Sequence, residues 1–208
     1  MLEITPIIYI VDDDPSVRSS LRLLLESAGY EVICFSSAKE FLKFRLDSTT
    51  AHCLILDVKM PDLNGIELQK ELASINNTIP IIFITGHGDI PMGVQAMKDG
   101  AVNFLSKPFD DQQLLDSINE ALIRDINFRK KQSEHDQIKQ KIDTLTPREN
   151  EILRYLITGM LNKQIAYKLN ISERTVKAHR KQVLDKMGIQ SIAELVRLTE
   201  KLGITPVE

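Results

Sequence analysis

The sequence predicts an α/β domain with a doubly wound, five-stranded parallel sheet, followed by a small all-α domain. In the first part of the chain, short apolar runs alternate with segments of helical periodicity, which is typical of parallel strands joined by helices. The later part shows four helical segments and no strand pattern. Net charge changes as well, from −8 over residues 1–124 to +4 over residues 144–208. We therefore expect two domains at these positions, joined by a linker over residues 125–143, and the basic second domain is a candidate for binding nucleic acid.

Composition and length exclude several classes of protein. No apolar run approaches the roughly 18 residues that span a bilayer. The N-terminal residues MLEITP lack the basic and apolar regions of an export signal. The two cysteines, Cys34 and Cys53, lie in strand-like apolar runs, so we expect reduced core residues and no disulfide. These features together predict a cytoplasmic protein.

The strands of the first domain are predicted from apolar runs that end in turn residues. The most informative run is Leu54-Ile55-Leu56-Asp57-Val58, in which four apolar side chains bracket one carboxylate. A continuous apolar run of this length is typical of a strand buried on both faces, and this strand would end at Asp57. In chain order, the expected strands cover residues 7–11, 30–35, 53–57, 80–85 and 102–106.

The helices between these strands are predicted from apolar residues at helical spacing and from helix stop signals. In the first helix, Val17, Leu21 and Leu25 share one face, and Gly29 follows the last turn. Asp14, just before this helix, either caps its N-terminus or is a solvated side chain. The expected helices cover residues 16–28, 38–45, 65–75 and 90–98, with a last one from 111 onward.

Polar side chains follow several strands at the carboxyl edge of the predicted sheet, where ligands of such sheets bind. Three carboxylates there would repel one another by about 4 kcal/mol per pair at ~4 Å and an effective dielectric near 20. A divalent cation would relieve this repulsion, and oxygen ligands favour Mg²⁺. With a lysine, a hydroxyl and a nucleophilic carboxylate, these are the parts of a phosphoryl-transfer site, although an aspartate after a strand often only starts a turn. The residues are Asp12, Asp13, Asp57, Thr85 and Lys107.

Four motifs in this part of the chain occur together in order: VDDD (11–14), LDVKMPDLNG (56–65), ITGHGD (84–89) and LSKPF (105–109). In these motifs the chain resembles the receiver domain of bacterial two-component response regulators, over roughly residues 5–124. The resemblance implies a flavodoxin-like fold and makes Asp57 the phosphoacceptor. His87, on a glycine-flanked loop, is interpreted as a solvated side chain in preference to a phosphate-relay residue.

The same resemblance assigns roles to the residues around Asp57. Asp12, Asp13 and Asp57 would bind one Mg²⁺ ion, together with the backbone carbonyl of Lys59. The resemblance further implies phosphoryl-binding side chains, a switch aromatic and a cis peptide bond. These are Thr85 and Lys107 for the phosphoryl oxygens, Phe104 as the aromatic that follows Thr85, and Lys107-Pro108 as the cis bond.

The linker contains neither Gly nor Pro, because none occurs between Pro108 and Pro147. A helical apolar stripe continues to Ile126, but residues 129–137 contain no apolar side chain. Helix formers dominate, so we expect a partly helical connector in preference to a solvated tether. A coiled coil is disfavoured because its apolar seam is interrupted for more than two turns.

The second domain begins with Thr146-Pro147-Arg148-Glu149, a capping box with proline at the first helical position. Ser172 is expected to cap the third helix, and Ser191 with Glu194 forms a second capping box. The pattern of the middle two helices predicts a helix-turn-helix. The expected helices extend from 147 to about 159, from 162 to 169, from 172 to 187 and from 191 to 202.

The third of these helices has one apolar and one basic face. Val176, Val183, Leu184 and Met187 form the apolar face. Basic side chains on the other face, around one alanine, suit a helix that enters a DNA major groove, although a charged stripe can also be a solvated helix face. The basic face contains Arg174, Lys177, Ala178 and Lys181.

The segments LTPRENEIL (145–153), NKQIAYKLNIS (162–172) and TVKAHRKQVLDKMG (175–188) resemble the LuxR/FixJ/NarL-type DNA-binding domain. In that family the third helix reads DNA, so Lys177, Ala178 and Lys181 would face the bases. His179 would pack internally, and the fourth helix would form the dimer contact. The expected phosphate or structural contacts are Arg174, Thr175, Arg180, Asn162 and Lys163.

Together, these resemblances predict a response regulator of the FixJ/NarL type and not an enzyme, apart from its own phosphorylation and dephosphorylation. A sensor histidine kinase would phosphorylate Asp57, and the protein would bind double-stranded promoter DNA, as a homodimer formed on phosphorylation or on DNA. RNA polymerase is a further candidate partner. One alternative is a Mg²⁺-dependent phosphatase with an accessory basic domain, which the absence of a cap insertion disfavours. Another is an RNA-binding output domain, which the helix-turn-helix pattern disfavours.

Overall fold

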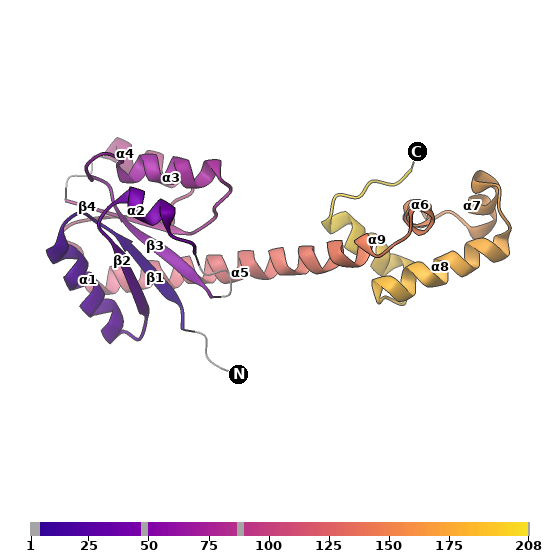
Figure 1. Ribbon diagram of the computed structural model, residues 1–208, viewed down its shortest axis with the longest axis horizontal. Coiled ribbons are helices and arrows are strands. Elements are labelled where there is room, and N and C mark those ends of the chain that lie inside the picture. Colours follow the sequence, from indigo (N-terminus) through magenta and orange to yellow (C-terminus); the bar gives the residue numbers. More distant parts are fainter. Residues whose placement is uncertain (1–4, 47–49, 87–89, 208) are drawn as a thin grey trace. The chain divides into compact units, whose positions relative to one another are not determined.

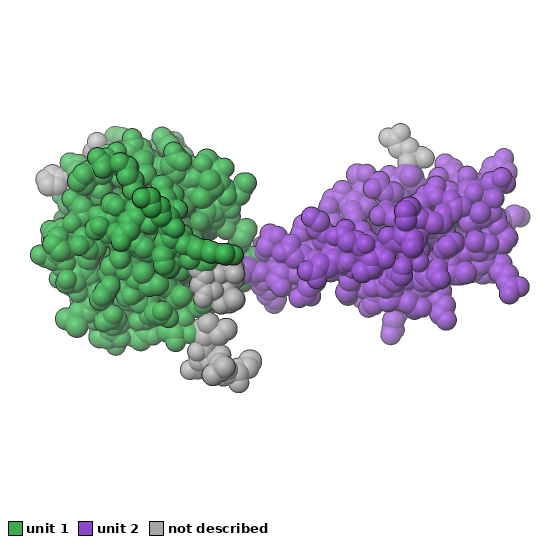
Figure 2. Space-filling view, viewed as in Figure 1, with its two compact units in different colours: residues 1–128 green, residues 129–208 purple. Residues whose placement is uncertain are grey.

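The computed structural model describes residues 5–46, 50–86 and 90–207. The chain divides into two compact units, Met1–Phe128 and Arg129–Glu208 (Figure 2). No described helix combines the length and apolar character that crossing a bilayer requires.

The first unit is built on a five-stranded parallel sheet in the order β2-β1-β3-β4-β5 (Figure 1). β1 lies between β2 and β3, and β4 lies between β3 and β5, so the chain crosses over after β2. This arrangement confirms the predicted flavodoxin-like fold, and each strand lies within two residues of its expected range. The strands are β1 (Ile7–Val11), β2 (Glu31–Phe35), β3 (His52–Asp57), β4 (Ile81–Thr85) and β5 (Asn103–Ser106).

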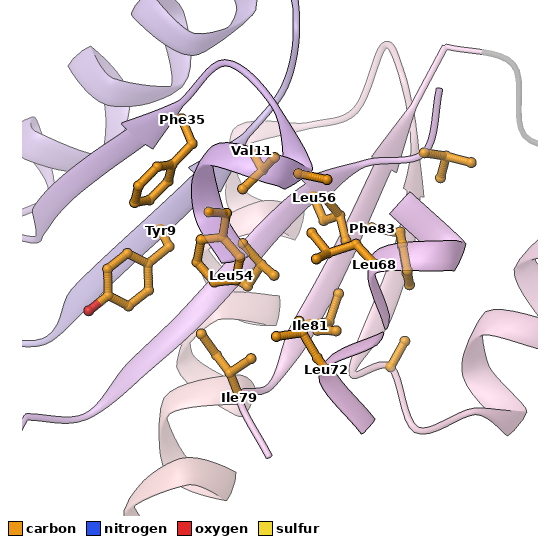
Figure 3. Packing of buried hydrophobic residues seen from close by; sticks show 14 of the residues in the cluster. Tyr9, Val11, Phe35, Leu54, Leu56, Leu68, Leu72, Ile79, Ile81 and Phe83 are labelled. Atoms are coloured by element: carbon orange, nitrogen blue, oxygen red, sulfur yellow. The ribbon is translucent and has the colours of Figure 1, made fainter. Parts of the chain in front are cut away.

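Helices cover both faces of this sheet, and side chains alternate between the two cores along each strand. On one face, the cluster of buried residues that contains Tyr9 of β1 also includes residues of α2, α3 and α4, and Figure 3 shows Tyr9 with several members of this cluster. Ile8 and Ile10 pack with α1 and α5 on the other face. The helices are α1 (Pro15–Ser27), α2 (Ala38–Lys43), α3 (Gly65–Ser74), α4 (Ile90–Lys98) and α5 (Asp111–Asp143).

Two helix starts in this unit have local causes. Asp14 caps α1, because its side chain accepts from the N–H of Ser16, so α1 begins at Pro15, one residue earlier than expected. Asn64 and Glu67 form a capping box at the start of α3, each side chain accepting from the other residue's N–H at 2.9 Å. The start of α3 is therefore fixed a few residues after Asp57.

α5 contains the residues that were expected to form the linker. Its first half packs in the core of the first unit through Leu114, Ile118 and Leu122. Ile138 is buried in the core of the second unit, and Ile142 packs against that core. Residues 125–143 are therefore the C-terminal part of one helix, because no Gly or Pro interrupts it.

The second unit is a small helical bundle with one apolar core. Thr146 and Glu149 form the predicted capping box, and Ser172 caps α8 as expected. At α9, Ser191 is the cap, but the carboxylate of Glu194 accepts from the N–H of Gln190, so the reciprocal bond of the predicted capping box is displaced by one residue. The helices are α6 (Pro147–Leu156), α7 (Asn162–Leu169), α8 (Glu173–Met187) and α9 (Ile192–Lys201).

Candidate functional site

The carboxyl edge of the sheet brings Asp12, Asp57 and Lys107 together. Asp12 follows β1, Asp57 ends β3, and Lys107 follows β5. The ammonium of Lys107 lies between the two carboxylates, 2.9 Å from Oδ2 of Asp12 and 3.2 Å from Oδ1 of Asp57. The structure therefore places one cation between two of the predicted acidic ligands.

Backbone donors hold the remaining carboxylate oxygens. The N–H of Asp14 donates to Oδ1 of Asp12 at 2.8 Å, and the N–H of Lys59 donates to Oδ2 of Asp57 at the same distance. Gly65 allows α3 to begin close to this edge, since a Cβ there would lie 2.4 Å from the carbonyl oxygen of Asp57. Asp12 is only 1% exposed and Asp57 only 6%, so both carboxylates are largely shielded from solvent.

Burial and charge shift the acid–base properties of this cluster. Burial raises the pKa of Asp57, and the nearby charge of Asp12 adds to this, against the opposing effect of Lys107. Burial alone would lower the pKa of Lys107, but its hydrogen bond to Asp12 and the charges of both carboxylates outweigh it, so that the pKa of Lys107 is raised. Lys107 therefore remains a cation.

Asp13 differs from the expected arrangement of three crowded carboxylates. Side chains of successive residues in an extended chain point in opposite directions, so Asp13 is exposed where Asp12 is buried. Among the residues that the structure describes, no three His, Cys, Asp or Glu side chains are gathered closely enough to hold a metal ion. The ligands predicted from the sequence, which are Asp12, Asp13, Asp57 and the Lys59 carbonyl, nevertheless offer only oxygen atoms, and oxygen suits a hard cation such as Mg²⁺.

Thr85 lies on β4, the strand beside β3, and Phe104 lies on β5, the next strand of the sheet. Thr85 is fully buried at the end of β4, and its carbonyl accepts from the N–H of Lys107 at 2.7 Å. The ring of Phe104 is half-buried, with its centroid 6.1 Å from that of Phe83. The Lys107-Pro108 peptide bond is cis, as the resemblance implied. His87 lies outside the described residues.

Two further residues, which the sequence pattern did not single out, make contacts at the two ends of the strands that carry the site. Arg18 of α1 donates from Nη1 to the carbonyl oxygen of Asp12 at 2.7 Å. Asp125 of α5, only 3% exposed, accepts from the N–H of His52 at the start of β3. A single acidic residue within the apolar stripe of α5 was the available signal for Asp125, whereas nothing in the pattern marked Arg18.

In the second unit, α8 has the two faces that its sequence predicts. Val176, Val183 and Met187 are fully buried, and His179 is half-buried. Thr175 contributes to the start of α8, because its N–H and hydroxyl both contact the hydroxyl of Ser172. The side chains expected to face the bases, together with one expected phosphate contact, are exposed: Lys177, Ala178, Lys181 and Arg174.

Two contacts shape the surface around α8. Lys177 forms an exposed ion pair with Glu173, one turn earlier, at 3.4 Å. Arg180 donates to the side chain of Asn162 at the start of α7, also at 3.4 Å. Lys163 lies beside Asn162 and is exposed. The structure thus groups the residues predicted to contact DNA on α8 and on the N-terminal end of α7.

Two protein families match this chain. Residues 8–119 match the response regulator receiver domain, and residues 143–199 match the luxR family of bacterial regulatory proteins. Neither match supports the alternative of a Mg²⁺-dependent phosphatase.

Two curated relatives match this chain over nearly its whole length. Nodulation protein W of Bradyrhizobium diazoefficiens is 49% identical over 199 residues, which cover 96% of this chain and 87% of that protein. The transcriptional regulatory protein FixJ of the same organism is 42% identical over 95% of this chain and 96% of its own length.

Among solved structures, response regulator StyR matches with a TM-score of 0.85 and 49% identity, covering 95% of this chain and 99% of StyR. The second-unit helices therefore belong to a luxR-type DNA-binding domain, and a histidine kinase and DNA are the partners that this family implies. The chain belongs to the two-component response regulators of the FixJ type, which regulate transcription in a phosphorylation-dependent way.

Proposed function

We propose that a sensor histidine kinase phosphorylates this protein on Asp57 and that the phosphorylated protein changes transcription at the promoters it binds. The observation that carries the assignment is the placement of Lys107 against Oδ1 of Asp57 at the end of β3. A carboxylate oxygen held beside a fixed ammonium can attack phosphorus while the developing charge on the phosphoryl oxygens is neutralised.

In the proposed transfer, an oxygen of Asp57 forms a bond to phosphorus as the bond from phosphorus to the kinase histidine breaks. Lys107 then moves its hydrogen bond from the carboxylate to a phosphoryl oxygen, and Thr85 offers a hydroxyl donor from β4. Asp12, Asp13, Asp57 and the backbone carbonyl of Lys59 would hold one Mg²⁺ ion, which would offset the charge of the transferring group.

Phosphorylation would change the equilibrium between two states of the receiver domain. Lys107 and Thr85 would contact the phosphoryl group only when it is present, and Phe104 would follow Thr85 inward. A shift from ~1% to ~99% of the active state requires about 5.5 kcal/mol of differential stabilisation. We infer that dimerisation and DNA binding supply part of this energy.

The second unit would read promoter DNA through α8. Lys177, Ala178 and Lys181 would face the bases, while Arg174, Thr175 and the α7 end around Arg180, Asn162 and Lys163 would contact phosphates or support the helix. Dimers formed through α9 would bind paired half-sites, and RNA polymerase would be the partner through which transcription changes.

Labelling with acetyl phosphate and Mg²⁺ tests the assignment of Asp57. We expect one phosphoryl group on the wild-type protein and none on Asp57→Asn, with Asp62→Asn as a matched exposed control in the following loop. Labelling that persists at another residue in Asp57→Asn would refute the site. Gel shifts with duplex promoter DNA and with RNA of the same sequence, before and after phosphorylation, test the output.

A further inference from the structure

We propose that Arg18 is a positioning residue for the acidic ligands of the receiver domain and that it sets the affinity of the site for Mg²⁺. This inference rests on the proposed function of Asp12 and Asp57. Arg18 itself would contact neither the phosphoryl group nor the cation.

The contact that carries the inference joins α1 to the end of β1. Nη1 of Arg18 donates to the carbonyl oxygen of Asp12 over 2.7 Å, and the Arg18 side chain is half-buried. A hydrogen bond from a guanidinium is stronger and more directional than one between neutral groups. The backbone of Arg18 is fixed as well, because its N–H donates to the carbonyl of Asp14 at 3.1 Å.

The carbonyl that Arg18 binds belongs to the peptide unit between Asp12 and Asp13. A peptide unit is planar, so a bond that fixes its carbonyl also fixes the direction in which the chain enters Asp13. The other polar groups of Asp12 are already held by the Phe35 carbonyl, the Asp14 N–H and the Lys107 ammonium. With Arg18, the backbone carbonyl of Asp12 has a partner as well. The same bond therefore orients Asp13, whose carboxylate is exposed.

Glu40 of α2 lies close enough to Arg18 for their charges to interact. The pKa of Glu40 is lowered, mainly by hydrogen bonds from Ser36, and the positive charge of Arg18 contributes to the same shift. The N–H of Ser36 donates to Glu40 at 2.8 Å, so the carboxylate is itself fixed. The fixed negative charge of Glu40 therefore adds an attraction on the Arg18 guanidinium to its hydrogen bond with the Asp12 carbonyl.

Arg22, one turn later on α1, is a matched control for the charge. Arg18 and Arg22 line the same groove beside Cys34, but Arg22 is exposed. Within the described part of the chain, Arg22 makes no side-chain hydrogen bond or ion pair. Substitution of Arg22 removes the same charge from the same helix and leaves the Asp12 carbonyl bound.

Calorimetric titration of the full-length protein with Mg²⁺ tests this role, on wild type, Arg18→Ala, Arg18→Lys and Arg22→Ala. Removal of a residue that orients metal ligands typically weakens metal binding about 10–100-fold, and we expect a Kd increase of this order for Arg18→Ala. Arg18→Lys should recover part of the loss, because an ammonium can donate to the same carbonyl. Arg22→Ala should bind Mg²⁺ as wild type does.

The rate of labelling by acetyl phosphate, measured as a function of Mg²⁺ concentration, gives an independent readout. We expect Arg18→Ala to need more Mg²⁺ for half-maximal rate and to approach the wild-type rate at saturation. An Arg18→Ala Kd within twofold of the Arg22→Ala Kd would overturn the inference, as would a lower saturated rate with unchanged Kd. Failure of the proposed function would instead be evident in the wild-type protein, which would then neither bind Mg²⁺ nor become labelled on Asp57.

Discussion

The main-chain N–H of His52, the first residue of β3, donates to Oδ2 of Asp125 on α5 over 3.0 Å. The imidazole Nε2 of His52 lies 3.9 Å from the other carboxylate oxygen, and its ring packs 5.7 Å from that of Tyr9. Both residues are at least 95% buried. Since β3 carries Asp57 at its other end, this pair ties α5 to the phosphoacceptor strand.

Replacement of Asp125 by alanine should destabilise the receiver domain by about 2 kcal/mol, because the buried N–H of His52 would lose a charged acceptor. Urea-induced unfolding of the full-length protein measures the change. Asp116→Ala is the control, since Asp116 lies on the same helix but is exposed and should change stability by less than about 0.5 kcal/mol. Equal effects of the two substitutions would mean that the His52–Asp125 bond contributes nothing.

Asp57→Asn should make the protein more stable at neutral pH. Burial raises the pKa of Asp57 above its ordinary value of 3.8, so the folded chain retains this proton to a higher pH than the unfolded chain does. The protonated carboxyl of Asp57 therefore stabilises the folded chain fully below pH 3.8, and this contribution is lost as the pH rises through the folded-state pKa. Thermal unfolding should show a higher midpoint for Asp57→Asn at neutral pH and a smaller difference at about pH 4. A lower midpoint at neutral pH would contradict this.

Lys107→Ala should leave Mg²⁺ binding intact or make it tighter, while it uncouples phosphorylation from DNA affinity. The ammonium of Lys107 already occupies the space between Asp12 and Asp57, so its removal leaves two carboxylates that a cation can neutralise. Calorimetry with Mg²⁺ and gel shifts before and after phosphorylation test the two parts. Coupling equal to that of wild type would refute the role of Lys107 in the switch.

The sequence predicted the sheet well, because strands buried on both faces are continuous apolar runs and their ends are marked by polar residues. It also predicted which strand ends meet, since the carboxyl ends of parallel strands share one edge. The position of Lys107 between Asp12 and Asp57 was not predictable, because it depends on side-chain conformation. The same is true of Asp13, whose exposure follows from how the chain leaves β1, and of Asp125, whose acceptor role depends on packing between β3 and α5.

Gly93 of α4 packs against the ring of Phe104, and its substitution by alanine should favour the active state. A Cβ at this position would lie 3.2 Å from Cδ1 of Phe104, closer than ordinary van der Waals contact, so the ring would be pushed away from α4. We expect unphosphorylated Gly93→Ala to bind promoter DNA several-fold more tightly than wild type, a difference of about 1 kcal/mol.

Gln95→Ala is the control for this effect, because Gln95 is exposed on α4 and also becomes an alanine in a helix. Replacing glycine by alanine inside a helix stabilises that helix by about 1 kcal/mol. Thermal unfolding should therefore be measured for both variants, so that this effect can be separated from the contact with Phe104. DNA affinity of Gly93→Ala equal to that of Gln95→Ala would show that the Phe104 contact does not control the output.

Lys177 and Lys181 on α8 should determine which bases are preferred, whereas Lys163 at the start of α7 should contribute to affinity for any DNA. Each base contact is worth about 1–3 kcal/mol of discrimination, so Lys177→Ala and Lys181→Ala should relax the preference at particular base pairs. Lys163→Ala should weaken binding to all sequences alike and reduce the salt dependence of log K by about 1. The exposed pair of Lys177 with Glu173 is too weak to prevent the contact. Affinities for a set of single-base operator variants at several salt concentrations separate the two classes, and a uniform loss for Lys177→Ala and Lys181→Ala would place both lysines on phosphates.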